Sequence, residues 1–171
     1  MNTLPRNRMP SPALLLLPLV FAGLPWNSTV IAQADHAKAH CEQVSGTIMT
    51  NLGVITENTT LGTATGDLRG AVSATILQVS PAGDGSITFS VQHHWVTDAG
   101  ETLTFAPVDV VTAPVGQGIF GATAPSPLFL TGGTGRFERA TGALAAFGAA
   151  DLTRGQTVFR YSGEVCLKSR G

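Results

Sequence analysis

Charged side chains are scarce in this chain: lysine, arginine, aspartate and glutamate together make up 12% of its 171 residues. The basic residues are scattered, and no two of them are adjacent. Nucleic-acid binding and attachment to an anionic membrane surface both need clustered positive charge. The composition therefore argues against a nucleic-acid partner and against a membrane-surface partner.

Helical patterns and known catalytic motifs are also missing. No window carries an apolar i, i+3, i+4, i+7 stripe long enough to predict a helix. The chain contains no G-x-S-x-G, no H-E-x-x-H, no C-x-x-C and no phosphate-binding loop. We therefore expect no cofactor and no metal, and an active site is not recognisable from motifs.

The N-terminal apolar run, residues 13–23, is too short to span a bilayer core of about 30 Å as a helix. Arg6 and Arg8 precede it, and an A-x-A site, Ala32 to Ala34, follows it. This order is typical of a secretory signal peptide, which we place at residues 1–34. A retained anchor or a disordered leader is the alternative.

Cleavage after Ala34 leaves 137 residues, 35–171, enough for one domain with a core. Without the two leader arginines, 8 basic residues face 11 acidic ones, so the formal charge is 8 − 11 = −3. Glycine, threonine, alanine and valine are abundant, which favours a β protein with many turns. We expect a secreted or periplasmic protein whose oligomeric state stays open, a homo-oligomer included.

Only two cysteines occur, Cys41 and Cys166, one near each end of the mature chain. In an oxidising compartment an even pair placed in this way predicts a structural disulfide. It would close a loop of about 125 residues, for which the chain-entropy relation gives about 4–5 kcal/mol. A reactive thiol or a metal ligand is the alternative interpretation.

Residues 86–97 alternate between a mainly apolar face and a mainly polar face, which is the period of a half-buried strand. One face carries Ile87, Phe89, Val91, His93 and Trp95. Residues 71–80 follow a similar pattern, except that the apolar positions shift to the other face at Leu77. The turn-forming residues between these segments predict a hairpin.

Further strand patterns recur at hairpin spacing along the whole mature chain. They cover residues 44–50, 53–63, 101–112, 119–123, 127–130, 136–152 and 157–168. Eight or nine strands in one domain predict an all-β fold, a single closed antiparallel β-barrel of about eight strands, because closure removes exposed edges. A two-sheet β-sandwich is the alternative.

A glycine cluster in TGGTGRFERATG, residues 131–142, separates two of these strands. Gly132, Gly133 and Gly135 can adopt the positive φ values that a chain reversal requires. Gly142 interrupts a strand pattern, which indicates a bulge or a close backbone approach. We assign these four glycines a structural role in the turn.

The stretch GGTGRFERATG and the last strand TVFRYSGEV resemble the C-terminal half of the allene oxide cyclase and dirigent superfamily. The upstream GDLRG, residues 66–70, is similar to secreted bacterial members. The resemblance implies an eight-stranded barrel domain over 35–171, with a hydrophobic cavity. The activities known in the superfamily are the cyclisation of a fatty-acid allene oxide and the guidance of phenoxy-radical coupling. Its functional residues do not map onto positions of this chain.

Two residues are weak catalytic candidates. His93 shares its strand face with Phe89 and Trp95, and the three could form a binding surface of aromatic area with one polar group. A hydrogen-bonded core histidine is the plainer interpretation. Asp109, in the apolar stretch FAPVDVV, is the carboxylate that we expect to be buried, and burial would raise its pKa. An edge or turn position, two residues after Pro107, is the alternative.

Two function classes follow. The first is a non-catalytic barrel that binds a small apolar or aromatic ligand or serves as a structural module. The second is a cyclase or isomerase acting on a hydrophobic substrate in the barrel cavity. The first is favoured, because no catalytic set can be identified.

His36 and His40 have the i, i+4 spacing of a helical metal site, but they lie in a terminus that we expect to fray.

Overall fold

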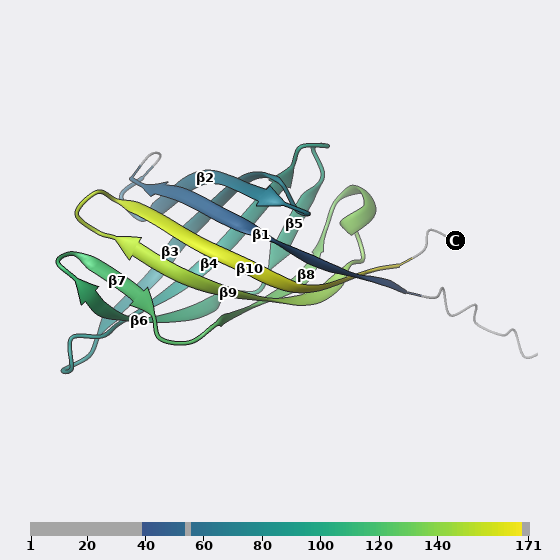
Figure 1. Cartoon of the computed structure of the whole chain (residues 1–171). Helices are drawn as coiled ribbons and strands as arrows, with labels where there is room; N and C mark the ends of the chain where they lie inside the picture. The colour runs from purple at the N-terminus through teal and green to yellow at the C-terminus, as the bar shows by residue number, and fades with distance from the viewer. Residues whose placement is uncertain (1–38, 54–55, 169–171) are drawn as a thin grey trace, which may run out of the picture. The chain divides into compact units, whose positions relative to one another are not determined.

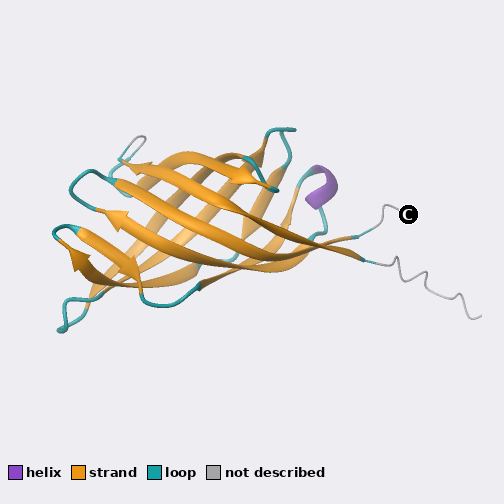
Figure 2. Cartoon of the chain, viewed as in Figure 1, coloured by secondary structure: helices purple, strands orange, loops and turns teal. Residues whose placement is uncertain are grey.

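The computed structural model describes residues 39–53 and 56–168. The predicted signal peptide, residues 1–34, and His36 lie outside the described residues. Nearly all of the described chain is strand or connecting turn, apart from one 3₁₀ turn, Gly135–Phe137 (Figure 2). The strands are β1 (His40–Leu52), β2 (Thr59–Gly66), β3 (Gly70–Pro81), β4 (Ile87–Thr97), β5 (Thr102–Phe105), β6 (Val108–Gly116), β7 (Ile119–Ala122), β8 (Ser126–Gly133), β9 (Thr141–Asp151) and β10 (Gln156–Leu167).

The strands form a closed antiparallel barrel (Figure 1). Going around the ring, the order is β10, β1, β2, β3, β4, β5, β8 and β9, and the pairing of β9 with β10 closes it. Two extra strands, β6 and β7, pair with each other and connect β4 to β9 at one end of the barrel. The predicted all-β barrel of about eight strands is therefore confirmed, and the sandwich alternative is wrong.

The two extra strands arise because two long strands are interrupted. Both β5 and β6 pair with β4, and the two residues between them are Ala106 and Pro107. Both β7 and β8 pair with β9, and Pro125 lies in their connection. Proline has no N–H to give to a strand ladder, so pairing stops at these points. The sequence pattern predicted the interruption at Pro125, but it predicted one uninterrupted strand over residues 101–112.

The hairpin of β3 and β4 has the predicted form, including an irregularity in β3. Ile76 pairs with Val91 and Gln78 pairs with Ser90, so Leu77 is the extra residue of a β-bulge. Upstream of the bulge, Val72 and Ala74 are buried, whereas Leu77 and Val79 are exposed. The shift of the apolar pattern in the sequence therefore has a structural cause.

The first and last strands are joined covalently. Cys41 and Cys166 form a disulfide, with a Cα–Cα distance of 3.9 Å, at a position where β1 and β10 pair directly. The predicted bridge is confirmed, and it places both ends of the described chain at the same end of the barrel (Figure 1). A structural disulfide indicates an oxidising, extracellular-type environment.

The barrel half next to the disulfide is filled by large side chains. Trp95 packs edge-on against Tyr161, with ring centroids 5.2 Å apart, and lies 5.9 Å from the ring of Phe105. The Tyr161 hydroxyl accepts a hydrogen bond from the Leu68 N–H (3.0 Å) and donates one to the Thr65 carbonyl (2.9 Å). Burial of the ring raises the pKa of Tyr161. We call this half of the barrel interior the closed end.

The glycine cluster lies at the closed end. Gly135 has a φ of +62°, a left-handed conformation that favours glycine. Gly133 has no positive φ, but a Cβ there would overlap the carbonyl oxygen of Thr102, so close approach is its requirement. At Gly142 a Cβ would overlap the Glu164 carbonyl in the same way. Within this turn, Phe137 is fully buried and adds to the packing of the closed end.

Candidate functional site

A cavity of about 130 Å³ occupies the half of the barrel away from the disulfide. Its lining comes from the end of β1, the start of β2, the first halves of β4 and β10, and parts of β3, β6, β8 and β9. The exposed residues Leu152 and Gln156 belong to the lining, so the cavity reaches the surface beside the β9–β10 turn. We call this opening the mouth.

The walls of the cavity are mostly apolar. Inward-facing positions of neighbouring strands supply them, because side chains alternate between the two faces of each strand. The main apolar contributors are Ile48, Val72, Ile76, Phe89, Leu128 and Phe159. Such a lining favours an apolar ligand over a charged one.

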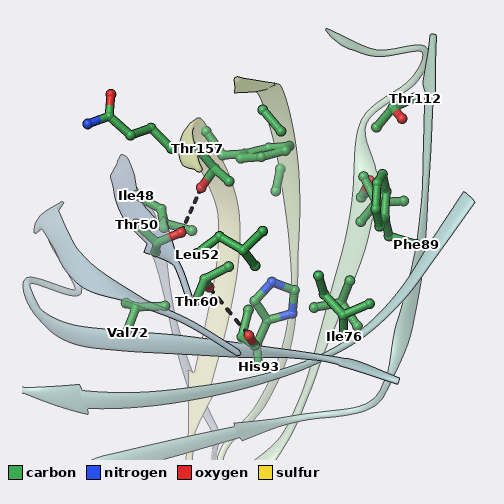
Figure 3. A pocket seen from close by; sticks show the side chains of 18 of the residues that line it. Ile48, Thr50, Leu52, Thr60, Val72, Ile76, Phe89, His93, Thr112 and Thr157 are labelled. Carbon is green, nitrogen blue, oxygen red and sulfur yellow. Dashed lines mark hydrogen bonds between the residues drawn. The ribbon is translucent and has the colours of Figure 1, made fainter. Parts of the chain in front are cut away.

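Several hydroxyl groups on the wall already take part in hydrogen bonds within the protein. Thr50 and Thr157 share a hydrogen bond of 2.7 Å across β1 and β10 (Figure 3). Thr60 donates to the Ala74 carbonyl (3.4 Å), and Thr112 donates to the Ile87 carbonyl (2.9 Å). These bonds reduce the polarity that the wall presents to a ligand.

His93, on β4, is the histidine of the cavity lining, which it shares with Leu52 and Ile76 (Figure 3). The Nδ1 atom is buried and has no hydrogen-bond partner. Burial lowers the pKa of His93 to about 4, and the neighbouring His94 contributes through charge repulsion. The ring is therefore neutral at physiological pH.

Asp151 is the acidic residue of the lining, and it lies at the mouth. Its carboxylate accepts hydrogen bonds from the Thr153 side chain and N–H, the Arg154 N–H, and the Arg154 guanidinium at 2.8 Å. These bonds, with the Thr153 hydroxyl making the largest contribution, lower the pKa of Asp151 to about 2. The carboxylate therefore braces the β9–β10 turn.

The structure brings together only part of the binding surface expected from the sequence. Phe89 and His93 line the cavity, as inward-facing residues of the same strand. Trp95 faces inward as well, but it is 1% exposed and belongs to the closed end instead of the cavity wall. Its indole N–H is buried without a hydrogen-bond partner. A single strand face thus spans both halves of the barrel interior.

The expected burial of Asp109 is wrong. Asp109 is exposed on the outer face of β6, opposite Ser90 of β4. The neighbouring residues Val108, Val110 and Thr112 occupy the inward positions, so strand alternation turns the Asp109 carboxylate outward. Asp109 is not available to chemistry inside the barrel.

The hydroxyl-bearing residues of the wall, including Thr50, Ser126 and Thr157, were not among the residues predicted from the sequence. A threonine or serine at an inward position of a strand pattern can be recognised in the sequence. Such a hydroxyl indicates a hydrogen bond inside the barrel, because buried hydroxyls are uncommon unless they are hydrogen-bonded. That signal identifies an interior position without locating it along the barrel axis.

One group of possible metal ligands occurs among residues 39–53 and 56–168: Cys41, Glu164 and Cys166. Its two sulfur atoms are joined in the disulfide, so they are not thiolates and do not form a metal site. Within the same residues, no helix is sufficiently long and apolar to cross a bilayer.

No family model and no curated protein matches the chain. Among solved structures, the chain is similar to the pterocarpan synthase dirigent protein GePTS1. The two share 16% sequence identity with a TM-score of 0.38, over 86% of this chain and 100% of the other.

Proposed function

We propose that this protein is a secreted barrel that binds a small, mainly apolar ligand in its cavity without chemical turnover. The observation that carries the proposal is an apolar cavity with His93 as its single histidine and a mouth at the protein surface. Its volume of about 130 Å³ is close to the roughly 150 Å³ of an apolar protein cavity that binds benzene. The ligand is therefore a molecule of about one ring.

The electrostatics of the cavity favour binding over catalysis. A general base works best when its pKa is near the operating pH, and a pKa of about 4 makes His93 a weak base at neutral pH. The carboxylate of Asp151 is already engaged by Thr153 and Arg154. A cyclase or isomerase would need a second group near His93, so we place this function second.

Secretion belongs to the same proposal. The disulfide fits an oxidising compartment, and the predicted signal peptide, residues 1–34, provides a route there. Mass spectrometry of the protein recovered from outside the cytoplasm should show an N-terminus at Asp35 and a mass lower than that of the reduced chain by two hydrogen atoms.

Ligand binding is tested by native mass spectrometry of protein recovered from its host, followed by calorimetric titration with single-ring compounds such as ethylbenzene. Saturable binding with one site per chain is expected. Ala146→Leu adds volume to the cavity wall and should weaken binding at least tenfold, whereas Ala145→Leu adds the same volume on the exposed outer face of β9. Equal affinities of the two folded variants, or no binding by the wild type, would overturn the proposal.

A further inference from the structure

The Nδ1 atom of His93, which has no hydrogen-bond partner, indicates which kind of polar group the cavity can bind. The two ring nitrogens of a neutral imidazole differ, since one donates and the other accepts. His93 lines the cavity while its Nδ1 is buried, so the ring edge that reaches the cavity is the one that carries Nε2. The tautomer of His93 therefore decides whether the cavity offers a donor or an acceptor.

The burial of Nδ1 favours one tautomer. A proton on Nδ1 would be an N–H donor that is buried without an acceptor, whereas an unprotonated Nδ1 would leave only a lone pair unpaired. Orphaned buried N–H groups are rarer in proteins than under-satisfied acceptors. The proton consequently resides on Nε2, where a ligand or a water molecule in the cavity can accept it.

We propose that His93 presents an Nε2–H donor to the cavity and thereby selects single-ring apolar ligands that carry one oxygen acceptor, such as a carbonyl or ether oxygen. This inference rests on the proposed function, because it assumes that the cavity binds a ligand. The internal hydrogen bonds of Thr60 and Thr112 commit their protons to backbone carbonyls, which leaves few competing donors. The bond between Thr50 and Thr157 uses one of their two protons, and the Ser126 hydroxyl also lines the cavity, so these three hydroxyls are the main competitors.

The test compares acetophenone with α-methylstyrene, which has the same shape but carries CH₂ in place of the carbonyl oxygen. The hydrocarbon leaves water more readily, so the informative quantity is the ratio of the two Kd values in each variant. A neutral hydrogen bond contributes about 1 kcal/mol, which corresponds to about fivefold. Replacing His93 by leucine should therefore shift the ratio about fivefold against the ketone.

Thr157→Val serves as the matched control, because it removes a wall hydroxyl and leaves the imidazole in place. Its ratio should equal that of the wild type, and a shift in this variant but not in His93→Leu would overturn the inference. Two-bond ¹⁵N–¹H correlation spectra of the wild type should show the His93 proton on Nε2. A proton on Nδ1 would also overturn it.

The proposed function and this inference fail in different ways. If neither compound binds the wild type, the cavity is not a site for single-ring ligands and the proposed function fails. If both compounds bind and their Kd ratio does not change on His93→Leu, the cavity binds apolar ligands but His93 does not donate a hydrogen bond to an oxygen acceptor of the ligand. Circular dichroism of each variant verifies that the barrel is folded.

Discussion

Protonation of His93 should destabilise the barrel between about pH 6.5 and pH 4. The pKa of His93 is about 4 in the folded protein and near 6.5 in the unfolded chain. Within this window the unfolded chain binds the proton more readily, so the free energy of unfolding decreases as the pH falls. The stability is fully present above pH 6.5 and is lost as the pH approaches 4.

The size of the loss follows from the difference between the two pKa values. At about 1.4 kcal/mol per pKa unit, the difference corresponds to roughly 3 kcal/mol, which is an upper limit because His93 faces a cavity with an open mouth. The pKa of the Asp151 carboxylate is lowered from 3.8 to about 2 by folding, so its own contribution to the pH dependence lies mainly below pH 4, outside this window.

Urea unfolding followed by circular dichroism at several pH values measures this effect. Carboxylates titrate in the same range, so the quantity of interest is the difference between the wild type and His93→Leu, which lacks the titrating ring. This difference should change by up to roughly 3 kcal/mol between pH 7 and pH 4. His94→Gln, on the exposed face, removes a nearby positive charge and should raise the pKa of His93. Parallel pH profiles for the wild type and His93→Leu would refute the argument.

Three further predictions concern stability. Replacing Cys41 and Cys166 by serine should cost about 4–5 kcal/mol, measured by urea unfolding, because the bridge closes a loop spanning 125 residues; unchanged stability would contradict this. Tyr161→Phe keeps the ring packing but removes both hydroxyl hydrogen bonds, and should cost about 1–3 kcal/mol in the same assay. Gly133→Val should lower the melting temperature strongly because its side chain overlaps backbone, whereas His94→Ala should cost within about 0.5 kcal/mol. Similar melting shifts for those two variants would show that the glycine is not required.

The sequence was a reliable guide to which side chains face the barrel interior. Period-2 alternation identified Phe89, His93 and Trp95 as one inward face, and the structure places all three inside. It could not indicate how far along the axis each one lies, because that depends on strand tilt and register. Consequently Trp95 was grouped with the cavity although it packs at the closed end against Tyr161, which is distant in sequence.

The Asp109 prediction failed for a different reason. An apolar neighbourhood in the sequence does not by itself imply burial, because Val108 and Val110 occupy alternate inward positions and leave the residue between them outside. The break at Ala106 and Pro107 sets the phase of this alternation, whereas a single strand over residues 101–112 would turn Asp109 inward. The disulfide was easier to predict, since the prediction depended only on the chain having two cysteines and on an oxidising compartment.

The disulfide and the mouth lie at opposite ends of the barrel. β1 starts beside Cys41, lines the cavity from Ile48 onward and ends at Leu52, roughly 35 Å from Cys41 at about 3.3 Å per residue. The last strand runs back in the opposite direction to Cys166. An affinity tag or surface linker attached beyond either cysteine would therefore hold the barrel by its closed end. Immobilised in this way, every molecule would present its cavity to the solution, and ligand exchange could be followed without blocking the mouth.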